Sequence, residues 1–177
     1  MANPCSEPRA LRRRLLIMTG VIGLMVLCDQ LSKAIIRAHL LPGEEIILLP
    51  HILSLHVWAN YSGFSWWVPA LPSWAGTVYR LLVLAIVLLA VPVYLYYSRY
   101  RRTSLWADLA FVNISAAMWG HLADDLFAPY TTDFIRIGDG PSANLADVCA
   151  AIGLTALVVE MVAFRRKSVK ERGGLKN

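Results

Sequence analysis

Two aspartates, Asp133 and Asp147, are the residues of this sequence whose surroundings most favour catalysis. Asp133 lies between apolar neighbours, where desolvation raises the pKa of a carboxyl. Asp147 lies three residues after Asn144, at the expected start of a helix, where the helix dipole favours a negative charge. If the two carboxyls meet, repulsion leaves one protonated and one charged, and such a pair activates a water against a peptide carbonyl. The spacing alone also permits a solvated acidic loop.

Further ionisable side chains accompany this pair. His121, Asp124 and Asp125 fall within about one helical turn. Asp29 and Lys33 are four residues apart, so they share a helix face and form an ion pair that staples the helix. Ionisable groups within membrane spans cost roughly 2.5–3.5 kcal/mol each on insertion scales, so each of them needs a partner or a function.

The composition is that of a membrane protein. Of the 177 residues, 57% are hydrophobic and 16% are charged, against ~25% charged residues in soluble domains. This excludes a disordered chain and argues against a soluble enzyme. The net charge is +5, but most Lys and Arg residues lie between or beyond apolar runs, as membrane-flanking charges do, which argues against a nucleic-acid partner.

We expect one integral-membrane domain over residues 1–177, mainly α-helical, with four transmembrane helices. A bilayer core needs ~20 mostly apolar residues per helix. Apolar runs place the four helices near 14–39, 77–98, 105–125 and 144–164. The basic stretch before the first apolar run is also typical of a secretory signal peptide, but the helix pattern continues beyond residue 29, so we expect an uncleaved first helix.

The basic clusters give the four helices a direction. Residues 9–14, 99–102 and 165–167 are rich in Arg and Lys, and with four spans all three clusters fall on one side, which the positive-inside rule makes cytoplasmic. Both termini are therefore expected in the cytoplasm, with the acidic cluster near the outer face. The basic tail 165–177 is expected to be mobile. Arg80, in the second span, either reaches the outer interface or faces the interior of the bundle.

The outer loop 40–76 is expected to form a small β-sheet on the outer face, between the first and second helices. Residues 45–60 are rich in Ile, Leu and Val, which suits short strands. The four tryptophans between positions 58 and 74 indicate an aromatic belt at the water–lipid boundary. A sheet that grips a ligand at that depth is a second interpretation, and the two are compatible.

Five ordered motifs resemble those of the lipoprotein signal peptidase family, also called signal peptidase II, over about residues 14–164. The resemblance begins with Asp29-Gln30-Leu31-Ser32-Lys33, which matches D-Q-x-S-K, and continues with Asn60, which matches the asparagine of N-x-G-A-A-F. The later motifs are Gly120-His121-Leu122-Ala123-Asp124-Asp125, similar to G-N-x-x-D-R, Thr132-Asp133-Phe134-Ile135, similar to V-D-F-I, and Asn144-Leu145-Ala146-Asp147, which matches N-x-A-D.

Members of this family are aspartic peptidases of the bacterial cytoplasmic (inner) membrane, which cut the signal peptide from prolipoproteins just before a cysteine that carries diacylglycerol. The resemblance implies prolipoprotein substrates carrying diacylglycerol, contact with membrane lipid, inhibition by globomycin-type cyclic depsipeptides, and neither a metal nor an organic cofactor. It makes the outer sheet a cradle for the substrate. It also implies that Asp133 and Asp147 are the catalytic pair, supported by the polar residues Asn144, Asp124, His121, Asn60, Asp29, Lys33 and Asp125.

The sequence departs from the family pattern at two of these supporting positions. His121 stands where G-N-x-x-D-R has asparagine, and Asp125 stands where that motif has arginine. A negative charge at position 125 disfavours ionisation of nearby carboxyls, whereas a protonated His121 restores part of the lost positive charge and makes activity pH-sensitive. A divergent member of the family is thus expected. The alternatives are an altered or inactive paralogue that binds lipoproteins, and a small proton-coupled transporter, since buried Asp, His and Lys also mark proton relays.

Overall fold

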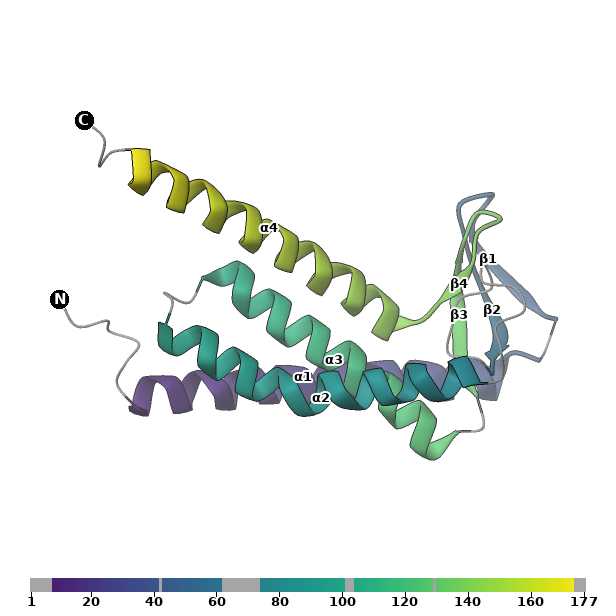
Figure 1. Cartoon of the computed structure of the whole chain (residues 1–177). Helices are drawn as coiled ribbons and strands as arrows, with labels where there is room; N and C mark the ends of the chain where they lie inside the picture. The colour runs from purple at the N-terminus through teal and green to yellow at the C-terminus, as the bar shows by residue number, and fades with distance from the viewer. Residues whose placement is uncertain (1–7, 42, 62–73, 101–103, 129, 174–177) are drawn as a thin grey trace.

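The computed structural model describes residues 8–41, 43–61, 74–100, 104–128 and 130–173 of the chain. The elements found there are, in chain order, α1 (Pro8–His39), β1 (Glu45–Leu49), β2 (Leu53–Asn60), α2 (Trp74–Tyr100), α3 (Leu105–Phe127), β3 (Thr131–Ile137), β4 (Ser142–Ala143) and α4 (Leu145–Gly173). Figure 1 shows the helices side by side with the sheet at one end, while the start of α1 and the end of α4 lie at the other end. The molecule is therefore mainly helical, with a small sheet at one end.

Three of these helices are long and apolar enough to cross a membrane. The candidate spans are Arg9–His39 in α1, Trp74–Arg99 in α2 and Leu145–Phe164 in α4. Their surfaces expose many Leu, Ile and Val side chains, as expected where lipid rather than water surrounds a helix. In the part of the chain that the structure describes, α3 is not among the candidate spans, and it carries acidic residues near both ends. The prediction of a fourth span stays a prediction.

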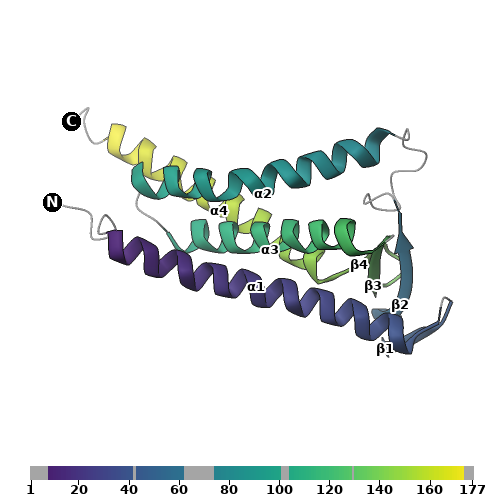
Figure 2. The ribbon, with the colours of Figure 1, turned by 90° about the horizontal axis from the view of Figure 1, so that it is seen from below.

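The central helix of the bundle is α3. Figure 2 shows it between α1 and α2, and it packs against α4 as well. A Cβ atom added at Gly153 of α4 would lie 2.7 Å from Ile114 Cγ1 of α3, so this glycine permits a close approach of the two helices. Small side chains serve the same purpose on α3, where the buried residues include Ala107, Ala110, Ala116, Ala117 and Gly120.

The sheet is antiparallel, with the strand order β1-β2-β3-β4. Strands β1 and β2 arise from the outer loop 40–76, as predicted. The sheet also contains β3 and β4, which come from the connection between α3 and α4 and were not predicted. The sequence Thr-Thr-Asp-Phe-Ile-Arg-Ile of β3 has the β-branched and aromatic residues that suit a strand. The sheet consequently joins the outer loop to the segment that holds Asp133.

The ends of two helices also differ from the predictions. Helix α1 begins at Pro8 rather than near 14, with proline in the first turn, where its missing N–H costs no hydrogen bond. Helix α4 continues past 164 to Gly173, so that much of the tail expected to be mobile is helical, as its Arg, Lys and Glu residues favour. Residues 174–177 and the loop segment 62–73, with two of its tryptophans, lie outside the described residues.

Candidate active site

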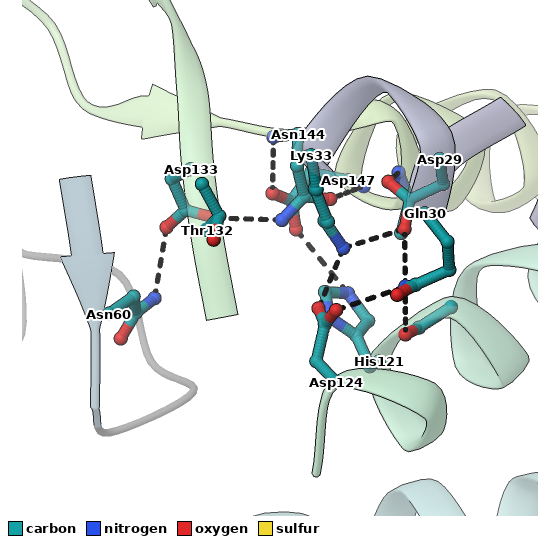
Figure 3. A network of polar contacts seen from close by, with 12 residues as sticks. Asp29, Gln30, Lys33, Asn60, His121, Asp124, Thr132, Asp133, Asn144 and Asp147 are labelled. Carbon is teal, nitrogen blue, oxygen red and sulfur yellow. Dashed lines mark hydrogen bonds and ion pairs between the residues drawn. The ribbon is translucent and has the colours of Figure 1, made fainter. Parts of the chain in front are cut away.

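The carboxyl group of Asp133 is buried at the junction of the sheet and the helices. Strand pairing sets Trp58 opposite Asp133, which brings Asn60, two residues further along β2, within reach. Asn60 Nδ2 donates to Asp133 Oδ2 over 3.1 Å, and Asn144 Nδ2 donates to Asp133 Oδ1 over 2.7 Å (Figure 3). Asp133 is only 5% exposed. Two neutral amides thus hold this carboxyl.

The start of α4 positions the second aspartate. Asn144 immediately precedes the helix and acts as its N-cap: its Oδ1 accepts the Asp147 backbone N–H over 3.1 Å. In return, Asp147 Oδ2 accepts the Asn144 backbone N–H over 2.9 Å. This reciprocal pair is a capping box with aspartate in the place of the usual glutamate or glutamine. Asn144 therefore bonds both carboxyls of the predicted pair, Asp133 through its side-chain amide and Asp147 through its backbone N–H.

The two carboxyls have different surroundings. The side chain of Asp147 is 41% exposed, and its Oδ1 lies 3.4 Å from Nε2 of His121 on α3. For Asp133, burial and the nearby charge of Asp147 raise the pKa to about 6, against the lowering effects of the Asn60 and Asn144 hydrogen bonds and of Lys33. The Asp133 carboxyl accordingly holds its proton up to a higher pH than an ordinary aspartate.

A buried ionic network beside the pair joins α1, α3 and α4. Lys33 is fully buried, and its Nζ lies 2.6 Å from Asp29 Oδ2 and 2.6 Å from Asp124 Oδ2. The sequence predicts the pair with Asp29, whereas the second partner on α3 turns the helix staple into a link between helices. Asp29 Oδ1 also accepts the Ala146 backbone N–H over 3.0 Å, so a side chain of α1 caps the first turn of α4.

Close packing at Gly120 makes this network possible. A Cβ atom at this position would lie 3.0 Å from the Cβ of Ala146 and 3.2 Å from Asp29 Oδ2, so a larger residue would push α1 and α4 away. The side chain of Gln30 spans the same junction, with Nε2 lying 3.0 Å from Asp124 Oδ1 and 3.1 Å from Asp29 Oδ2. The packing therefore fixes the network that supports the start of α4.

The remaining predicted residue, Asp125, has a partner on α2. Arg80 Nε lies 3.2 Å from Asp125 Oδ1, and the Arg80 side chain is 60% exposed. The sequence left the position of Arg80 open, and the structure places it at the surface against Asp125. Arg80 thus pairs with the negative charge that this sequence has where the family motif has arginine.

Three residues of the site region were not predicted as functional. Gln30 lies inside the D-Q-x-S-K motif, and its place in that motif is a signal that identifies it. Arg37 Nη1 donates to Oγ1 of the buried Thr132 over 2.8 Å, beside Asp133. Arg37 follows Lys33 by four residues on the same helix face, and this spacing is the signal for it. Arg80 gives no such signal, since its partner is distant in the sequence.

Several hollows lie on the described part of the chain, and two of them differ sharply in character. One, of about 240 Å³, reaches Asp133 from the outer sheet and is lined by Trp58, Arg136 and His56, among others. The other, of about 430 Å³, is an almost entirely apolar groove between α2, α3 and α4, lined by residues such as Leu89, Ile114 and Leu157. The groove lies along the half of the bundle away from the sheet, so the two hollows share no lining residue.

Comparisons with known proteins agree with the motifs. The sequence model of a protein family described as "Signal peptidase (SPase) II" matches residues 21–163. A lipoprotein signal peptidase of Dehalococcoides mccartyi is 32% identical over 142 residues, which cover 76% of this chain and 81% of that protein. A lipoprotein signal peptidase of Pseudomonas aeruginosa is 27% identical over 153 residues, or 84% of this chain and 88% of that protein.

The fold also has a counterpart among solved structures. A bacterial membrane enzyme determined by the in meso method at 2.3 Å resolution superposes with a TM-score of 0.65 and 19% sequence identity. The superposition covers 83% of this chain and 88% of that chain. At this level of identity, the likeness shows a shared fold.

Proposed function

The chain belongs to the signal peptidase II family, and from this premise we propose that it is an aspartic endopeptidase that removes the signal peptide of bacterial prolipoproteins. The cut falls just before the cysteine that carries diacylglycerol. The observation that carries the proposal is the contact of Asn144 with both Asp133 and Asp147. The lipoprotein signal peptidases to which the chain is similar support the substrate class.

In the first chemical step, a water bound between the carboxyls attacks the carbonyl carbon of the residue before the cysteine. The oxygen of the water bonds to that carbon while Asp147 takes a proton from the water. Asp133 gives its proton to the carbonyl oxygen. A tetrahedral diol results, with Asp147 protonated and Asp133 ionised. The partial exposure of Asp147 and the burial of Asp133 support this assignment of roles.

In the second step the diol collapses. Asp147 gives its proton to the nitrogen of the cysteine, the C–N bond breaks, and a hydroxyl of the diol returns a proton to Asp133. The products are a signal peptide with a carboxyl end and a lipoprotein with a free amino group. Both aspartates regain their starting states, so the cycle consumes only one water.

The membrane placement belongs to the same proposal. All four helices span the bacterial cytoplasmic membrane, both termini face the cytoplasm, and the site lies near the outer face. The basic residues at the start of α1 lie at the end of the bundle away from the sheet, which supports this orientation. Helix α3 serves as the fourth span. Its ionisable residues are paired with other helices and so are kept away from lipid, as in the ion pairs of Asp124 with Lys33 and of Asp108 with Arg14.

The hollows suggest how the substrate enters. The signal helix and the diacylglyceryl chains are apolar and reach the bundle sideways from the bilayer, where the groove between α2, α3 and α4 offers matching surface. The polar chain that follows the cysteine lies along the sheet, beside Asp133. Globomycin-type inhibitors are expected to compete for this site.

A strain that lacks its own lipoprotein signal peptidase tests the function. The wild-type chain should restore processing of a diacylglyceryl-modified prolipoprotein on a gel, and Asp133→Asn and Asp147→Asn should not. Glu44→Gln, a matched loss of an exposed carboxylate, should process normally. Normal processing by either aspartate variant would show that the pair is not catalytic.

A departure from the family motif at position 125 supports a second candidate function. The negative charge at Asp125, where the family motif has arginine, favours an altered paralogue that binds lipoproteins without cutting them. In that case the wild-type chain would fail to restore processing, yet would still bind a lipid-modified prolipoprotein in detergent.

A further inference from the structure

We infer that His121 is a positioning residue that holds Asp147 as the ionised member of the aspartate pair, so that the proton of the pair resides on Asp133. This inference rests on the proposed function and assigns the two carboxyls their separate roles. It concerns a position at which the sequence departs from the family motif, which has a neutral asparagine there.

The contacts of Asp147 favour a carboxylate. Its Oδ1 lies 3.4 Å from Nε2 of His121, and its Oδ2 accepts the backbone N–H of Asn144. Both oxygens therefore face donors, one of which becomes a cation when the imidazole is protonated. A hydrogen bond from a charged donor is roughly twice as strong as one between neutral groups, so the ionised form gains most.

The contacts of Asp133 are different in kind. Its two oxygens bond to the amides of Asn60 and Asn144, which carry no charge. Each carboxyl oxygen has two hydrogen-bonding positions, so a proton and an amide N–H can share one oxygen. Burial further disfavours a charge on Asp133, whereas Asp147 is partly open to water. Asp147 has a donor that can carry a positive charge, whereas Asp133 has only neutral amide donors. The shared proton therefore binds preferentially to Asp133.

The other charges around the pair do not create this asymmetry. Lys33 acts on both carboxyls, and its charge is balanced by its own two partners, Asp29 and Asp124. Among the described residues, the ion-pair contact to either carboxyl comes from His121. The titratable and charged groups around the pair are Lys33 from α1, Tyr79 from α2, His121, Asp124 and Asp125 from α3, and His56 and Arg136 from the sheet.

The imidazole itself is held in place. His121 is buried on α3, and its ring meets the ring of Tyr79 edge-on, with centroids 6.2 Å apart. It directly follows Gly120, where an added Cβ atom would lie 3.0 Å from the Cβ of Ala146 at the start of α4. A side chain fixed in this way contacts Asp147 without paying the full entropy of ordering a mobile surface group.

The pH profile of cleavage distinguishes this role from a merely structural one. On the acid side the rate falls as Asp147 takes up a proton, and the nearby His121 imidazole opposes that protonation. Removal of the imidazole makes Asp147 protonate earlier as the pH falls. Loss of a close cation moves the midpoint of a carboxylate's titration by about 1–3 pH units. We expect the low end of that range because His121 Nε2 lies 3.4 Å from Asp147, whose side chain is partly exposed.

The test uses the full-length chain in detergent or lipid, with a diacylglyceryl-modified prolipoprotein, and measures kcat between about pH 4 and pH 9. His121→Asn introduces the residue of the family motif. Both this variant and His121→Gln should shift the acid limb of the kcat profile toward higher pH by about one pH unit. His39→Asn, at an exposed histidine of α1, should reproduce the wild-type profile. An acid limb that stays in place in both His121 variants, with or without a lower kcat, would overturn the inference.

The aspartate variants separate this inference from the proposed function. If Asp133→Asn and Asp147→Asn abolish cleavage while the His121 variants keep the wild-type acid limb, only the role of His121 is wrong. If the aspartate variants cleave normally, the proposed function itself fails.

Discussion

The side-chain amide of Asn144 donates a 2.7 Å hydrogen bond to Asp133 Oδ1. The same residue caps α4 and bonds the carboxyl of Asp147 through its backbone N–H. One buried asparagine thus joins a strand of the outer sheet to the first turn of a helix. The geometry of the candidate pair depends on this single helix cap.

Replacing Asn144 should therefore affect both stability and cleavage. Asn144→Ala removes an N-cap, which costs about 1 kcal/mol, and also frees Asp133 to move. A misplacement of the order of 1 Å costs about 100-fold in rate, so kcat should fall by about that factor with little change in KM. Steady-state kinetics on a lipid-modified prolipoprotein checks this. Asn113→Ala should keep its kcat, because Asn113 is another buried asparagine of the bundle and its Nδ2 donates to the Leu109 carbonyl within α3.

Lys33 should contribute strongly to stability because it neutralises two buried carboxylates. Lys33→Met leaves Asp29 and Asp124 without their cation, and loss of one partner from a buried ion pair costs roughly 3–5 kcal/mol. A large fall in Tm of the detergent-solubilised protein is expected. Adding Asp124→Asn to Lys33→Met should recover part of that loss. A Lys33→Met variant with the wild-type Tm would contradict the network described above.

Arg80 provides the opposite case. The Arg80 side of its pair with Asp125 is exposed, and pairs open to water contribute about 0–1 kcal/mol. Arg80→Ala should therefore lower Tm far less than Lys33→Met does. Thermal unfolding in the same detergent compares the two variants directly. Equal losses in both would mean that the Arg80–Asp125 pair is shielded from solvent in the membrane-bound protein.

Asp133 should make the protein less stable as the pH rises. Its pKa is about 6 in the folded chain against an ordinary value of 3.8, so the folded state binds the proton more tightly than the unfolded state. The stabilisation is fully present below about pH 4 and is lost as the pH rises through about 6. Asp133→Asn cannot lose a proton, so its Tm relative to wild type should be higher at pH 8 than at pH 4. Asp139→Asn, at an exposed carboxylate, should give the same difference at both pH values.

The sequence predicts the parts of this molecule that depend on local patterns. Apolar runs locate the helices, and β-branched residues locate the strands of the outer loop. The family motifs identify Asp133, Asp147 and Asn144, and the structure brings these three residues together. The four-residue spacing from Asp29 to Lys33 predicts their ion pair correctly. Each of these features is encoded within a short stretch of sequence.

Features that depend on distant contacts were missed. The pairing of β2 with β3 joins Asn60 to Thr131, and no local pattern specifies it. The second partner of Lys33, Asp124, is 91 residues away. The contact between Arg80 and Asp125 likewise depends on how α2 packs against α3. Such contacts follow from the packing of whole elements, which a single sequence does not display.

The most direct test of the catalytic pair compares single and double variants of the purified chain. Cleavage rates of a diacylglyceryl-modified prolipoprotein should be measured for Asp133→Asn, Asp147→Asn and the double variant. Residues that act as one unit are strongly non-additive, so each single variant should be as inactive as the double variant. A single variant that keeps most of the wild-type rate, or losses that multiply in the double variant, would contradict a shared-proton aspartate pair.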